Sequence, residues 1–217
     1  FDGTEVRAIT KAGQLHDGVL LNRSLLWSVL TFVSEGIWHI LKGFDHVLFV
    51  LCLTLAATSL GRLLWSITGF TIGHSATLIA GFLGLAPSGA WFVPAVETAI
   101  SLSIIYAGAM ALFGKSSIRT VWITAAIGLL HGFGFSFVLS DILGRNSPNL
   151  LVSLLSFNAG VEVGQLLIVA VAWGLLLAAR RMHWKFAFGL RTAVAAGSIA
   201  IACFWALERA VILTGAI

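Results

Sequence analysis

Long runs of apolar residues, separated by short polar breaks, dominate the sequence. The runs cover about residues 35–60, 63–85, 93–113, 119–143, 150–179 and 191–212. The breaks carry Gly, Pro, Ser, Lys or Arg, which are typical of turns between helices. A helix needs roughly 20 apolar residues to cross a bilayer, so the pattern predicts about six transmembrane helices. The expected fold class is therefore all-α, a polytopic membrane helix bundle.

The N-terminal end follows a different pattern. Residues 1–23 are polar, and the apolar run that starts at Leu25 is too long for one span. We interpret Leu25–Ser34 as an interfacial helix that leads into the first span. The expected domains are an extracytoplasmic tail over residues 1–34 and a six-helix transmembrane domain over residues 35–217. Since the chain begins with Phe1, we also expect that a signal peptide or a longer upstream region has been removed.

Composition supports a membrane location. Hydrophobic residues make up 59% of the chain and charged residues only 10%, too few to cover the surface of a soluble enzyme. The net charge of +4 does not indicate nucleic-acid binding, because the basic residues gather in loops. The loops after the first, third and fifth spans hold Arg62, Lys115, Arg119, Arg180, Arg181, Lys185 and Arg191. The positive-inside rule places these loops in the cytoplasm and both termini outside.

Several ionisable residues lie inside the apolar runs, where each costs about 2.5–3.5 kcal/mol to insert. Counting about 1.5 Å of rise per residue places one group near the midplane of the bilayer. That group contains Asp45, His46, His74, His131 and Glu162. His39 and Glu97 are expected in a second layer nearer the outer face. A single depth shared by four spans predicts one common site.

Polar and small residues accompany this group at helical spacing. Glu35, His39, Lys42 and His46 are spaced as one face of a continuous helix. Asn158 and Gln165 share a face with Glu162, and Thr71 and Ser75 share one with His74, so we expect these four to support the ligands. Three Gly-x-x-x-Gly pairs, Gly69/Gly73, Gly128/Gly132 and Gly160/Gly164, flank the group and predict close helix packing.

Three imidazoles with carboxylates form a nitrogen and oxygen ligand set that suits a divalent first-row metal. Thiolate ligands are absent from this layer, because Cys52 and Cys203 stand alone in apolar runs. The set therefore argues against a dedicated Cu(I) site, and its imidazoles argue against an all-oxygen Ca²⁺ or Mg²⁺ cage. The residues alone leave the choice of metal open.

Five segments of the chain resemble the HupE/UreJ family of bacterial membrane proteins. The segments are HILKGFDHVLFVL, ITGFTIGHSATL, VETAISLSIIY, GLLHGFGFSFVL and FNAGVEVGQLLIVA. The resemblance implies a secondary metal permease of the bacterial inner membrane that supplies nickel. It also implies that the H-x5-D-H motif, His39, Asp45 and His46 here, is needed for metal passage. Further family motifs fall on His74, Glu97, His131 and Glu162.

Two functions use the same residues. The first is a transporter for a divalent metal ion, with Ni²⁺ preferred and Zn²⁺, Co²⁺, Cu²⁺ or Fe²⁺ as the other candidates. The alternative is an intramembrane zinc-dependent hydrolase, with Glu162 or Asp45 as general base. Whether the protein is an enzyme thus stays open, although a transporter is favoured. The expected partners are the lipid bilayer, the metal ion, and metalloenzyme-maturation proteins or an outer domain.

Overall fold

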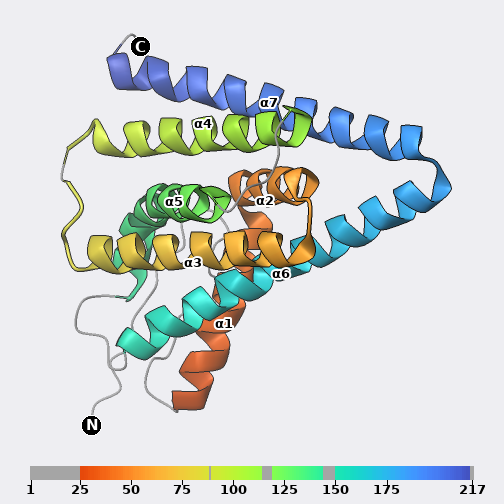
Figure 1. Ribbon diagram of the computed structural model, residues 1–217. Helices are drawn as coiled ribbons and strands as arrows, with labels where there is room; N and C mark the ends of the chain where they lie inside the picture. Colours follow the sequence, from red (N-terminus) through yellow and green to blue (C-terminus); the bar gives the residue numbers. More distant parts are fainter. Residues whose placement is uncertain (1–24, 88, 114–118, 144–149, 216–217) are drawn as a thin grey trace.

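The computed structural model describes residues 25–87, 89–113, 119–143 and 150–215, and these residues form seven α-helices and no strand (Figure 1). The helices are α1 (Leu25–Lys42), α2 (Phe44–Ala56), α3 (Leu60–Phe82), α4 (Phe92–Phe113), α5 (Arg119–Leu143), α6 (Leu150–Met182) and α7 (Trp184–Thr214). The prediction of an all-α helical membrane bundle is confirmed. Of the predicted tail over residues 1–34, residues 1–24 lie outside the described residues.

Four helices, α3, α4, α6 and α7, are long and apolar enough to cross a membrane. The bent pair of α1 and α2 makes a fifth if it counts as one span. The remaining predicted span, the fourth along the chain, corresponds to α5, whose apolar part within the described side chains, Thr120–Ser136, falls short of that length. Large apolar side chains such as Phe204 and Leu207 are exposed on α7, and lipid would cover such a surface.

The first span departs from the predicted helix boundaries. Helix α1 runs without interruption through Ser34, and the break comes at Gly43, where α2 turns away by 75°. The backbone of Gly43 is extended, with φ −77° and ψ 98°, which ends the helical register. The prediction that Glu35, His39, Lys42 and His46 share one helical face is therefore wrong, because His46 belongs to α2.

Glycines bring two helix pairs into backbone contact, as the Gly-x-x-x-Gly pairs predicted. On α5, a Cβ at Gly128 would collide with the carbonyl oxygen of Phe70, and one at Gly132 with that of His74. Helices α3 and α5 are thus packed without intervening side chains. In the second pair, a Cβ at Gly36 of α1 would collide with the backbone of α6, and one at Gly160 of α6 with that of α1.

Helix α2 lies inside the bundle. It packs against α4 and α6, and α4 in turn runs beside α7 (Figure 1). The central apolar cluster takes Phe49 from α2, Phe70 from α3, Ile104 from α4, Val169 from α6 and Ala202 from α7. The first turn of α2 lies at the edge of this packing, since Phe44 is 74% exposed whereas His46 is buried. Asp45 and His46 stand on that turn.

Candidate metal site

Four histidines from four helices gather where α1 breaks from α2. His39 comes from the last turn of α1, His46 from α2, His74 from α3 and His131 from α5. The ring centroids of His39 and His46 lie 4.8 Å apart, and those of His46 and His131 lie 5.0 Å apart. The ring of His74 is 6.0 Å from the rings of both His39 and His46. The close packing of α3 against α5 brings His74 and His131 into this group.

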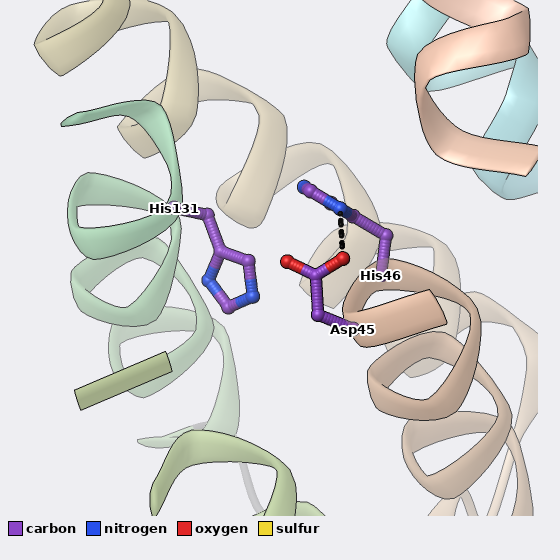
Figure 2. Close-up of side chains that lie close together, drawn as sticks. All are labelled: Asp45, His46 and His131. Carbon is purple, nitrogen blue, oxygen red and sulfur yellow. Dashed lines mark hydrogen bonds and ion pairs between the residues drawn. The ribbon is translucent and has the colours of Figure 1, made fainter. Parts of the chain in front are cut away.

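Asp45 adds a carboxylate to the histidines. Its Oδ1 lies 3.0 Å from Nδ1 of His46, and Figure 2 shows the ring of His131 facing the same carboxylate from α5. One ligand atom from each of Asp45, His46 and His131 fits within 4.8 Å of the other two. These three residues can therefore hold a metal ion. A negative charge in the first turn of α2 is also favoured by the helix dipole.

Gly43 leaves room for this arrangement. A Cβ at Gly43 would lie 2.8 Å from Nδ1 of His46, 2.9 Å from the main-chain oxygen of His39 and 3.0 Å from Oδ1 of Asp45. Its φ of −77° is open to any residue, so space and not backbone conformation accounts for glycine here. The break between the helices and the pairing of Asp45 with His46 thus depend on the same missing side chain.

Each of the four histidines has a buried ring nitrogen without a hydrogen-bond partner in the described part of the chain. In His131, Nδ1 lies 3.1 Å from the main-chain oxygen of Ile127; a hydrogen on Nδ1 donates to that carbonyl and leaves the Nε2 lone pair available. Within the described part of the chain, Nε2 of His39, His46 and His131 and both ring nitrogens of His74 are buried without a hydrogen-bond partner. A buried polar atom left unpaired costs about 1–3 kcal/mol. A bound cation would remove that cost.

Aromatic rings surround the histidines. Phe135 lies 4.0 Å from His39 between ring centroids, and Phe70 lies 5.0 Å from His131 and 5.9 Å from His74. Phe49 closes the side of His131, at 5.6 Å. Such walls keep water and dielectric screening low, so the attraction between a cation and Asp45 is stronger than in water.

A comparison with known protein families finds one family that matches this chain. The family model described as HupE / UreJ protein matches residues 16–209, nearly the whole chain. The chain belongs to the HupE/UreJ family. Its members are metal-transporter-like membrane proteins, and this one has a His/Asp group able to hold an ion. No curated protein and no solved structure matches the chain.

His39 lies elsewhere than predicted in this HupE/UreJ protein. Its ring contacts that of His46, so it belongs to the inner group and not to a separate outer layer with Glu97. The bend at Gly43 explains the difference, because a depth counted along a straight helix overestimates the separation of residues on either side of a turn. Glu97 instead pairs with Arg209 of α7, at 3.2 Å between Oε2 and Nε.

Glu162 lies in a polar cluster between α3 and α6. The hydroxyl of Thr68 donates to its Oε1 at 2.7 Å, and the hydroxyl of Thr71 contacts its Oε2 and lies 2.9 Å from Oε1 of Gln165. No described contact joins Glu162 to the group of Asp45, His46 and His131, so its role as a ligand stays a prediction. Sequence reasoning missed Thr68, although it precedes Thr71 by three residues on the same helical face.

The remaining support residues bond to their own helices. The amide of Asn158 donates to the main-chain oxygen of Leu154 at 2.9 Å. The hydroxyl of Ser75 donates to the main-chain oxygen of Thr71 at 2.7 Å. Thr71 and Gln165 meet across the α3–α6 contact, a pairing between helices that the spacing along each helix does not predict. Their position beside Glu162 supports packing of these helices.

Proposed function

We propose that this protein is a permease that carries a divalent transition-metal ion across the membrane, with Ni²⁺ as the first candidate. One observation carries the proposal: ligand atoms of Asp45, His46 and His131 lie within 4.8 Å of one another at the break between α1 and α2. His39 and His74 stand next to them with unpaired, buried ring nitrogens. Family membership supports the same reading.

The spacing of the ligands suits an ion that is bound and then released. Metal–ligand bonds of about 2.0–2.2 Å place neighbouring ligand atoms about 3–3.5 Å apart. A spread of up to 4.8 Å must therefore narrow when an ion binds, and it can widen again when the ion leaves. Binding at a broken helix is also common in secondary transporters, where the turn frees polar groups at membrane depth.

The donor set supports a borderline metal, since it consists of imidazole nitrogen and carboxylate oxygen. Cys52 is buried two turns further along α2, and Cys203 is exposed on α7, so neither supplies a thiolate beside Asp45. Ni²⁺ is preferred because of the family. Zn²⁺, Co²⁺, Cu²⁺ and Fe²⁺ suit the same donors and belong in the competition test.

Transport needs a driving force and a direction. We infer a multi-pass protein of the bacterial inner membrane that imports the ion, with its N-terminus outside. Two positive charges moved down a potential of 100 mV release about 4.6 kcal/mol, enough for about a thousandfold accumulation. Protons compete with the metal for His and Asp ligands, so protonation on the cytoplasmic side would assist release.

Uptake of radioactive Ni²⁺ into proteoliposomes under an imposed potential tests the proposal. We expect uptake above that of protein-free vesicles, loss of uptake in His46→Ala, and normal uptake in His183→Asn. The control histidine lies at the start of α7 and accepts a hydrogen bond from the Lys185 N–H, a cap that Asn retains. Absence of uptake by the unmodified protein would refute transport, and retained zinc that chelators cannot remove would favour the hydrolase instead.

A further inference from the structure

A cavity of about 250 Å³ lies between α2, α4 and α7, beside the metal-binding residues. Its walls include Asp45 from α2, Glu97 and Ser101 from α4, and Trp205 and Arg209 from α7. Glu97 stands in the second turn of α4 and Arg209 in the second-last turn of α7. The cavity thus lies toward the end of the molecule where α4 begins and α7 finishes (Figure 1).

Asp45 belongs to both the cavity and the metal-binding group. Its side chain is 31% exposed, whereas that of the neighbouring His46 is 5% exposed. The carboxylate therefore faces the cavity on one side and bonds to His46 on the other. A cation in the cavity meets Asp45 before it can reach His46 or His131.

Glu97 and Arg209 form an ion pair in the wall of the same cavity. The two side chains are 39% and 37% exposed, and half-exposed pairs of this kind are held only weakly. Arg209 is the one Lys or Arg among the lining residues that the structure describes. Two carboxylates, Asp45 and Glu97, oppose its single positive charge. Arg209 therefore reduces the attraction of the cavity for a cation.

We propose that this cavity is the route by which the metal ion reaches Asp45, and that Arg209 is an electrostatic gate on it. Arg209 forms an ion pair with the Glu97 carboxylate until a dication displaces it and binds Glu97. The ion then passes to Asp45. This inference rests on the proposed function, because it assigns the access path of the same site. It adds Arg209 to the residues that control transport.

Charge-neutralising variants separate a gate from a structural ion pair. In Arg209→Gln the cavity keeps two negative charges and one fewer positive charge, so the association rate of Ni²⁺ should rise about threefold to tenfold at low salt. In Glu97→Gln the rate should fall by a similar factor. The double variant keeps the net charge of the unmodified cavity and should be close to it. A purely structural pair predicts losses in both single variants, so a faster rate in Arg209→Gln supports the gate and a slower rate there overturns it.

Two controls accompany this measurement. Arg181→Gln removes one positive charge from the last turn of α6, at the opposite end of α7, and should leave the rate unchanged. Raising the ionic strength should reduce the differences between the cavity variants, because salt screens steering. Rates in purified protein can be followed by stopped-flow mixing with Ni²⁺.

Thiol labelling tests the cavity without metal or transport. In a Cys52→Ala/Cys203→Ser background, Ser101→Cys places a thiol one turn from Glu97, whose main-chain oxygen accepts from Ser101 at 3.0 Å. We expect a cationic methanethiosulfonate reagent to react faster than an anionic one, and Arg209→Gln to widen that difference. Leu102→Cys is the matched control, because Leu102 is next in the chain and 55% exposed outside the lining.

The outcomes keep the two proposals apart. Ni²⁺ should slow the labelling of Ser101→Cys and not that of Leu102→Cys. If both reagents react with Ser101→Cys at equal rates, or if Ni²⁺ gives no protection although the protein binds it, the access route is wrong while the permease still stands. If the unmodified protein binds no Ni²⁺, the proposed function fails and the metal route fails with it.

Discussion

Asp45 and His46 are adjacent in the sequence, yet their side chains bond to each other, with 3.0 Å between Oδ1 and Nδ1. A bond between consecutive side chains on a helix is uncommon, because successive residues point about 100° apart. The first turn of α2 accommodates it beside Gly43, where no side chain intervenes. The pair holds a carboxylate against an imidazole, and Asp45 is the acidic residue in the described group of Asp45, His46 and His131 that could hold a metal ion.

Replacing Asp45 with Asn should show how much the negative charge of this side chain, apart from its size, contributes to Ni²⁺ binding. The amide keeps the size of the side chain but removes the negative charge that offsets a dication in the apolar surroundings. We expect Ni²⁺ affinity to fall by at least about a hundredfold, with little loss of folded protein. Calorimetric titration of the purified variant measures the change. Affinity equal to that of the unmodified protein would remove Asp45 from the ligand set.

The space at Gly43 gives a second prediction. In Gly43→Ala the added methyl group would come within 3.0 Å of atoms from Asp45, His46 and His39, so the Asp45–His46 pair must shift. We expect about a tenfold loss of Ni²⁺ affinity with the helices retained by circular dichroism. Gly61→Ala is the control, because nothing lies within 4 Å of a Cβ there. Equal affinities in the two variants would show that the gap at Gly43 has no role in binding.

The sequence predicted the membership of this group better than its geometry. His46, His74 and His131 could be found because ionisable residues inside apolar runs are costly and need a partner. The break at Gly43 could not be found, since a single glycine in an apolar run fits a continuous helix as well as a turn. The same break explains why His39 lies in the inner group. Depths counted along a straight helix are wrong for residues on either side of a 75° bend.

Contacts between distant segments were beyond the sequence for a similar reason. Arg209 and Glu97 are separated by more than a hundred residues, and Thr68 meets Glu162 across two helices. Helical spacing shows which residues share a face of one helix, but it does not show which face of another helix they meet. The Gly-x-x-x-Gly pairs came closest to such information, because a stripe without side chains indicates where a partner backbone lies.

The contact between α3 and α5 should be sensitive to small additions. In Gly132→Ala the new Cβ would collide with the main-chain oxygen of His74 and the hydroxyl of Thr77, so the two helices must separate. We expect a loss of about 1–3 kcal/mol in the free energy of unfolding. Unfolding in mixed micelles measures it, with Gly197→Ala as control, where a Cβ meets open space. The same stability in both variants would contradict backbone packing at Gly132.

Glu162 is the residue for which the sequence and the contacts point to different roles. If Glu162 is a ligand, Glu162→Gln should lower the affinity for Ni²⁺. If Glu162 instead supports packing, the same substitution should leave the affinity unchanged and lower the free energy of unfolding by about 1 kcal/mol. The reason is that the hydrogen bonds from Thr68 and Thr71 to Glu162 join α3 to α6. The contacts favour the second outcome. Thr68→Val is the companion variant, since it removes one donor without altering the carboxyl group. Equal destabilisation by both variants with normal binding supports packing, whereas loss of binding in Glu162→Gln alone restores Glu162 as a ligand.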